Sequence, residues 1–168
     1  SIPEITTPFI STATLTSVGS GDEDGATVTY TATFTTAPTK DETVSFKVDG
    51  VDYSITVKAG ELTGTTTLNY SDIDVFVDPT TISAPTDLAT TNNSNYEDLK
   101  AVNSATKYDV ADSIDTTTVT LSGIVNNDQI IITATVDNAP ETNLTITLSN
   151  GKEITIEAGK TEGSTTFT

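Results

Sequence analysis

Carboxylates are the side chains of this sequence most able to do chemistry, and they cluster in segments that are typical of turns. The segment Gly21–Gly25 places three acids in a row, and Asp72 and Asp74 stand close together farther along. Ca²⁺ takes about six to eight oxygen ligands from carboxylates and carbonyls, so such turns suit it. The sequence therefore predicts Ca²⁺ as the cofactor. The candidate metal ligands are Asp22, Glu23, Asp24, Asp72, Asp74, Asp109, Asp112, Asp115 and Asp137.

The same acids have a plainer explanation, which the sequence leaves open. Turns favour Asp and Gly for conformational reasons, and exposed charge keeps a protein surface solvated. Each motif is also weak by itself, because Asp72-x-Asp74 lacks the glycine and the closing glutamate of an EF-hand loop. The calcium hypothesis depends on the clustering of acids in several predicted turns rather than on a single motif.

Catalytic chemistry is disfavoured by the residue types that are missing. The chain has no histidine and no cysteine, so only carboxylates are left for acid–base work. These carboxylates stand on predicted turn tips rather than in a cleft with apolar walls. Ser104-x-x-Lys107 has the spacing of a catalytic pair but lacks every partner motif. We therefore predict that the protein is not an enzyme.

The overall charge narrows the choice of partners. Among 168 residues, 24 are acidic and 7 are basic, which gives a net charge of -17. A polyanion repels nucleic acid, and an acidic surface repels anionic lipid, so we expect neither as a partner. No apolar run reaches the length of a membrane span, so direct membrane insertion is not expected. Because cysteine is absent, bound metal is one way left to staple an extracellular fold.

The elements that would position these acids repeat within the chain. Ala37-Pro38 recurs as Ala139-Pro140, and Ala59-Gly60 recurs as Ala158-Gly159. Both offsets are about 100 residues, the length of one small sandwich domain. We predict two modules, residues 1–114 with a closing linker and residues 115–168. The second module contains only its N-terminal part, strands A to E.

Threonine alternates with apolar residues along the predicted strands, as in Val28, Tyr30, Ala32 and Phe34. This period-two pattern is typical of an antiparallel sheet with one wet face. The predicted fold class is all-β, with antiparallel β-sandwich modules in tandem. The expected strands of the first module are 10–17, 26–36, 43–49, 52–58, 64–69, 75–84 and 105–110, and a short helical turn is expected near 96–101.

Longer segments resemble a known family. TYTATFTTAP and KAGELTGTTTL in the first copy, ITATVDNAP and IEAGKTEGSTT in the second, and VADSIDTTTVTL between them resemble the repeats of giant bacterial RTX-type adhesins. This family includes LapA-like biofilm adhesins exported by type I secretion, and the resemblance runs from Phe9 to Thr168. Two departures are that the second copy stops after its fifth strand and that no glycine-rich nonapeptide repeat is present.

The resemblance implies immunoglobulin-like extender modules of an extracellular adhesin, anchored at the bacterial outer membrane. Extenders of this family bind Ca²⁺ at module junctions and project a distal ligand-binding region, so the implied partners are neighbouring modules of the same chain, with the distal ligand unknown. An alternative hypothesis is a ligand-binding adhesin module that contacts a carbohydrate or a host protein. Its candidate contacts are Tyr53, Tyr70, Phe76, Tyr96 and Tyr108.

The predicted strand order directs the acids toward one junction. The turns at 22–24 and 72–74 are expected at the bottom of the first module, beside the linker acids at 109, 112 and 115. The top of the second module is expected to present Asp137, Asn138 and Glu141. For the short second copy three explanations stay open: a fragment boundary, completion by another chain or by further segments, and interruption by an insertion.

Overall fold

The structure is a computed structural model that describes residues 9–168, so the first eight residues of the predicted first module lie outside the described residues. Every regular element in this range is a β-strand, which confirms the all-β prediction. The described residues accordingly form no helix of the length and apolarity needed to cross a membrane. Two compact units are present, one made of residues 9–73 and 77–113 and the other of residues 74–76 and 114–168.

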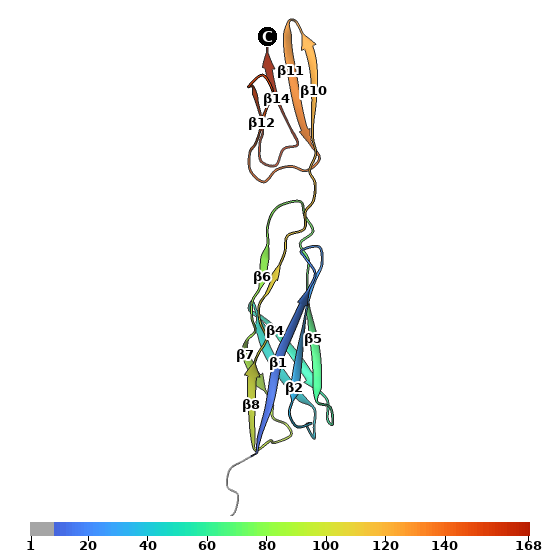
Figure 1. Cartoon of the computed structure of the whole chain (residues 1–168), viewed down its shortest axis with the longest axis vertical. Helices are drawn as coiled ribbons and strands as arrows, with labels where there is room; N and C mark the ends of the chain where they lie inside the picture. The colour runs from blue at the N-terminus through green and yellow to red at the C-terminus, as the bar shows by residue number, and fades with distance from the viewer. Residues whose placement is uncertain (1–8) are drawn as a thin grey trace, which may run out of the picture. The chain divides into compact units, whose positions relative to one another are not determined.

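The first unit is a sandwich of two main sheets (Figure 1). One sheet has the order β5-β2-β1-β8, the other has the order β4-β3-β7, and β6 pairs with β9 in a small ribbon. Most pairs are antiparallel, as predicted. The strands are β1 (Ile10–Ser20), β2 (Ala26–Phe34), β3 (Glu42–Val48), β4 (Val51–Val57), β5 (Thr63–Tyr70), β6 (Thr80–Ile82), β7 (Thr86–Thr90), β8 (Asp98–Asn103) and β9 (Tyr108–Val110).

The core of the first unit follows from the period-two pattern. The apolar residues of β2 are buried, and the threonines between them face outward and are largely half-buried. An aromatic group lies at the centre, where the ring centroids of Tyr30 and Phe46 are 5.0 Å apart and those of Phe46 and Tyr53 are 5.8 Å apart. The buried residues are Ala13, Leu15, Ala26, Val28, Tyr30, Ala32, Phe34, Val44, Phe46, Val48, Ile55, Val57, Ile82, Ala105 and Val110.

The segment after Pro79 departs from the prediction. The expected helical turn at 96–101 is wrong, because β8 is a strand that pairs in parallel with β1 from Ile10 opposite Asp98 to Leu15 opposite Asn103. The strand expected at 75–84 is confined to β6, since proline cannot donate a hydrogen bond to a sheet. In Figure 1, β8 lies directly beside β1, so this late segment closes an edge of the larger sheet.

Among the described residues, the second unit has five strands. They form a sheet of order β10-β11-β14 and a pair β12-β13. Their bounds are β10 (Val119–Asn126), β11 (Gln129–Val136), β12 (Leu144–Thr147), β13 (Glu153–Ile156) and β14 (Glu162–Phe167).

The two units share local hydrogen bonds at matching positions. Gly60 N donates to Pro38 O and Gly159 N donates to Pro140 O, both at 2.8 Å. Ala59 N donates to the side chain of Asp41 at 2.9 Å, and Ala158 N donates to that of Asn143 at 3.0 Å. The first five strands of the first unit therefore have counterparts β10 to β14 in the second.

Gly64 in β5 lies against residues of β4 in the other sheet, and its replacement is expected to be destabilising. A Cβ at Gly64 would lie 2.5 Å from Thr56 O and 2.8 Å from Ile55 Cγ2, and Gly163 meets Thr155 O in the same way. We expect Gly64→Ala to lower the free energy of unfolding by about 2 kcal/mol, because the backbone must shift. Urea unfolding measures this change. Gly25→Ala, where a Cβ meets nothing within 4 Å, is the control, and an equal loss in both variants would contradict the prediction.

Candidate metal centre

The loop between β1 and β2 has a fixed shape. Asp24 N donates to the Asp22 carboxylate at 3.0 Å, and Gly25 N donates to Asp22 O at 3.0 Å. Gly21 has a φ of 87°, and a Cβ there would collide with Gly25 O. This loop therefore needs glycine at Gly21, and its closure aims the residue between the two aspartates inward.

Glu23 is that residue, and backbone hydrogen bonds tie it to two other segments of the first unit. Its N–H donates to Ala111 O at 2.9 Å, after β9, and its carbonyl accepts from Asp72 N at 2.8 Å, after β5. Only 1% of Glu23 is exposed, which is rare for glutamate. These backbone hydrogen bonds bring together, within the first unit, the segments that carry Asp22, Asp72 and Asp112.

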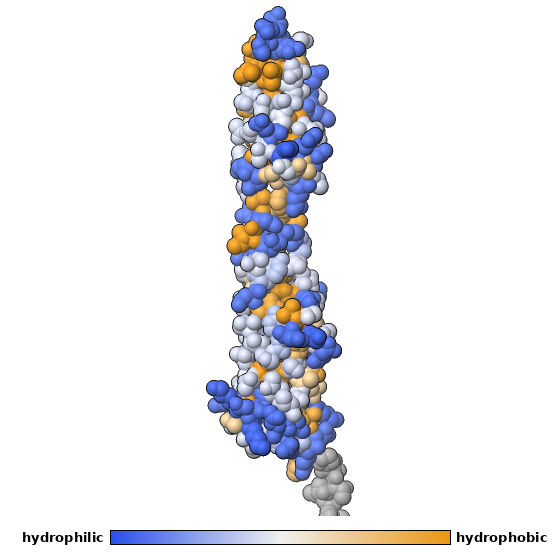
Figure 2. Space-filling model, turned by 180° about the vertical axis from the view of Figure 1, so that it is seen from behind, coloured by the Kyte–Doolittle hydropathy of each residue, from blue (hydrophilic) through white to orange (hydrophobic). Residues whose placement is uncertain are grey.

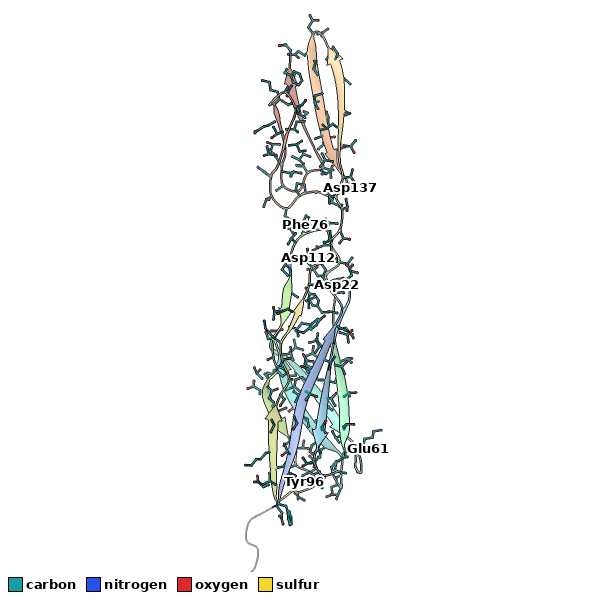
Figure 3. All side chains as sticks on the ribbon, viewed as in Figure 1. Asp22, Glu61, Phe76, Tyr96, Asp112 and Asp137 are labelled. Carbon is teal, nitrogen blue, oxygen red and sulfur yellow. The ribbon has the colours of Figure 1, made fainter. Side chains whose placement is uncertain are left out.

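The picture with side chains agrees with this placement. Asp22 and Asp112 lie at the same end of the first unit, whereas Glu61 and Tyr96 lie at the opposite end (Figure 3). The acidic end is therefore separate from the Ala59-Gly60 turn, although both ends consist of loops.

The electrostatics at Glu23 are uncompensated. Ser113 Oγ donates to Glu23 Oε1 at 2.9 Å, but Glu23 Oε2 is buried and has no hydrogen-bond partner. Carboxylate oxygens of Asp24 and of Asp78 lie within 4.8 Å of those of Glu23. The salt bridges of the described residues join Lys47 to Asp52 and Lys107 to Asp109, so neither serves Glu23.

This donor set fits a hard divalent cation. A buried carboxylate without a partner is costly, and nearby carboxylates add repulsion that a bound cation would relieve. The oxygens of Glu23, Asp24 and Asp78 are the ligand type that Ca²⁺ prefers, with backbone carbonyls of the loop as further donors. Asp78 and Ser113 are outside the predicted ligand set. The only sequence feature that pointed to Asp78 was its closeness to Asp72 and Asp74, and no sequence feature pointed to Ser113.

Asp109 has other partners within the first unit. Its exposed carboxylate accepts from Thr81 Oγ1 at 2.8 Å and from Lys107 Nζ at 3.1 Å. These hydrogen bonds, the one from Thr81 first, and the charge of Lys107 lower the pKa of Asp109. In this arrangement its carboxylate fastens β6 to β9.

Three further predicted ligands belong to the second unit. Asp74 and Asp115 are grouped there, and Asp137 is in the loop that follows β11. The Asp74 carboxylate accepts from Phe76 N at 2.9 Å, and that of Asp137 accepts from Thr118 N at 2.9 Å. The Asp74 carboxylate thus fixes a local turn, and the Asp137 carboxylate joins the loop after β11 to the segment before β10.

The second unit has no counterpart of the Glu23 loop. Its strands β10 and β11 are joined by Asn127 and Asp128, whose φ angles are 50° and 66°. Such a two-residue connection with positive φ at both positions is a tight hairpin turn. The acidic loop is therefore a property of the first unit among the residues described.

Three of the five aromatic residues considered for ligand binding take part in the fold. Tyr96 OH donates to Thr36 O at 2.7 Å, and Tyr108 OH donates to Gly21 O. Tyr53 stacks on buried Phe46. These contacts give the three tyrosines structural partners within the first unit.

Comparison with known families gives a match to the LapA domain at residues 10–113 and again at residues 115–168. No curated protein and no solved structure was found to match the chain. LapA domains belong to bacterial adhesins rather than to an enzyme family, which indicates a location at the cell surface. Since the two matches span nearly all of the described residues, the chain belongs to the LapA domain family.

Proposed function

We propose that the chain is a structural extender of a bacterial cell-surface adhesin, built of immunoglobulin-like modules in tandem and stiffened by Ca²⁺. Its partners are neighbouring modules of the same polypeptide, and its task is to hold a distal ligand-binding region away from the cell. The adhesin is of the RTX type, exported by type I secretion and held at the outer membrane. Membership in the LapA domain family supports the adhesin part of this proposal.

One observation carries the calcium part. Glu23 is buried, and no hydrogen-bond donor reaches its Oε2 atom. The carboxylates of Asp24 and Asp78 lie close to that of Glu23 and add further negative charge. Burial of a charge without a partner destabilises a fold unless a cation compensates it. The acids of an unneeded surface turn would instead point into water.

The residues of the first unit have distinct tasks in this proposal. Glu23 presents two oxygens and connects three chain segments through its backbone, and Ser113 fixes the orientation of its carboxylate. Asp24 and Asp78 add further oxygens. Bound Ca²⁺ would supply positive charge at this point, so the loop, the segment after β5 and the segment after β9 would be held together.

The same cation is proposed to act at the module junction. Asp74, Asp112, Asp115 and Asp137 are the further ligands proposed there, as expected from their places in the sequence. With these acids neutralised, the connection between modules would lose its self-repulsion and become less flexible. An array of such modules would then project its end farther from the cell.

Thermal unfolding with and without calcium tests the proposal. We expect the melting temperature to be higher in Ca²⁺ than in EGTA. At a free Ca²⁺ concentration one hundred times Kd, binding should add about 2.7 kcal/mol to the free energy of unfolding. Glu23→Gln should remove this response, and in EGTA the variant should be at least as stable as the parent because the buried charge is gone. Scanning calorimetry gives both values.

Glu61→Gln is the matched control, because it makes the same chemical change at an exposed position on the opposite end of the unit. It should leave the calcium response intact. Small-angle scattering of the full chain should show a narrower range of shapes in Ca²⁺ than in EGTA. An unchanged melting temperature, or an equal loss of response in both variants, would refute the calcium proposal.

A further inference from the structure

The second unit has an apolar groove between two open sheet edges. The groove has a volume of about 520 Å³ and is lined by Leu121, Ile132, Leu148 and Phe167, among others. Leu121 is 50% exposed, and Val125 on the same strand is 76% exposed. Within residues 9–168, no strand pairs with the outer edge of β10 or of β12. Figure 2 shows apolar surface on this unit.

The first unit shows what covers the equivalent face. Leu15 stands opposite Ala32 in the β1–β2 register, as Leu121 stands opposite Ala134 in the β10–β11 register. Leu15 is fully buried, whereas Leu121 is half exposed. In the first unit that face is covered by the segment Thr80–Val110, which has no counterpart among the described residues 114–168.

That segment covers its face in a specific way. Its strand β8 runs parallel to β1, and its strand β7 runs antiparallel to β3. Ile82, Ala105 and Val110 of the same segment are buried in the core. The two strands are in different sheets, so the covering segment must cross from one sheet to the other between them.

We propose that the groove of the second unit is a docking site for a polypeptide segment of the Thr80–Val110 type. One strand of the occupant pairs in parallel with β10, and the other pairs antiparallel with β12. Its apolar residues cover Leu121, Ile132 and Leu148. This inference does not depend on calcium and stands or falls separately from the proposed function.

A second copy of the chain fits the groove poorly. Pairing between two β10 edges would extend one sheet only and would leave the β12 edge open. It would also bring together two chains that each carry a net charge of -17. A segment that supplies a strand to each sheet satisfies both edges at once.

One position sets the chemistry of the occupant. The Ala37-Pro38 and Ala139-Pro140 pairs place Glu42 and Leu144 at equivalent points at the start of β3 and β12. In the first unit the Glu42 carboxylate accepts from Thr91 Oγ1 at 2.8 Å and from Ser94 N at 2.6 Å. The Leu144 side chain cannot accept a hydrogen bond, so the natural occupant carries an apolar residue where the first unit has Thr91.

The test uses a labelled synthetic peptide of residues 80–110 and the full chain. We expect binding by fluorescence anisotropy, with protection of β10 and β12 amides in hydrogen exchange. Leu144→Glu should tighten binding about tenfold, because it restores the carboxylate for the loop of the peptide. Leu121→Asp should weaken binding at least about tenfold, and Ile124→Asp, at an exposed position of alternate phase on β10, should not.

Several outcomes would overturn the proposal. These are no binding to either the parent or Leu144→Glu, equal or weaker binding by Leu144→Glu, and equal damage by Leu121→Asp and Ile124→Asp. Self-association of the chain in sedimentation, abolished by Leu121→Asp, would assign the groove to a second copy and overturn it too. Should Leu144→Glu disturb the unit by circular dichroism, Leu144→Gln replaces it, because its amide oxygen accepts from the same donors.

Discussion

Phe46→Ala is expected to lower the free energy of unfolding of the first unit by about 3–5 kcal/mol. Phe46 is 2% exposed and packs between Tyr30 and Tyr53, with ring centroids 5.0 and 5.8 Å away. Its removal leaves a cavity between the two sheets that the rigid strands cannot fill. Urea unfolding followed by tyrosine fluorescence measures the change, since the two neighbouring tyrosines, Tyr30 and Tyr53, pack in this core.

The internal repeat provides a matched comparison. Leu148 occupies the position of Phe46 in the second unit but lines an open groove and is only half-buried. Leu148→Ala should therefore cost the second unit only about 1–2 kcal/mol. Amide exchange resolves the stability of each unit separately, as two units need not unfold together. Equal losses in the two variants would mean that the groove is covered or that the core of the first unit is loose.

Glu42→Ala is expected to destabilise the first unit by about 3 kcal/mol. Glu42 is fully buried, and its carboxylate accepts from Ser94 N at 2.6 Å and from Thr91 Oγ1 at 2.8 Å. Without this carboxylate, both donors lose their partner, and the loop between β7 and β8 loses its anchor. Chemical denaturation gives the loss, and amide exchange of Ser94 shows whether the loop opens first.

The contribution of Glu42 to stability is also expected to depend on pH. Burial would raise the pKa of Glu42, but the hydrogen bonds from Ser94 and Thr91 outweigh it, and the pKa lies below its ordinary value. For a carboxyl with a lowered folded-state pKa, the unfolded state binds more protons in the window between the two values. Its contribution to stability is therefore present above the ordinary pKa of about 4.3 and is lost as pH falls through the lowered folded-state pKa.

Glu42→Gln isolates this contribution, because it keeps the shape and removes the titration. The difference in unfolding free energy between parent and variant should shrink as pH falls from neutral into the acid range. The control is Glu61→Gln, which makes the same chemical change at an exposed glutamate. A parent–variant difference that stays constant with pH would show that the charge of Glu42 does not hold the loop.

Much of the fold is predictable from strand periodicity, and one failure shows why the rest is not. The alternation in β2 and β3 predicts both the strands and their buried faces, and the structure agrees. Residues 97–101, in contrast, are good helix formers apart from Asp98, yet β8 is a strand. Its pairing with β1 depends on a partner more than 80 residues away, which local propensity does not report.

The candidate site was predictable in position but not in detail. Acids in the turn at 22–24 indicated the loop, but nothing in the sequence distinguished buried Glu23 from exposed Asp24. Glu42 could have been found, because it is in phase with buried Val44 and Phe46 along the same strand. The usual exposure of glutamate argued against that assignment. Asp109 is the opposite case. It lies in a segment where metal ligands were expected, but its carboxylate accepts hydrogen bonds from Thr81 and Lys107.

The tight Asn127–Asp128 turn of the second unit has a consequence for mechanics. Where the first unit has a five-residue acidic loop, the second has a short hairpin with no buried carboxylate to neutralise. Under the calcium proposal, successive module junctions would differ in stiffness, because the first unit has the acidic Glu23 loop and the second has the Asn127–Asp128 turn in its place. A fibre made in this way would bend at chosen places under flow and stay straight between them.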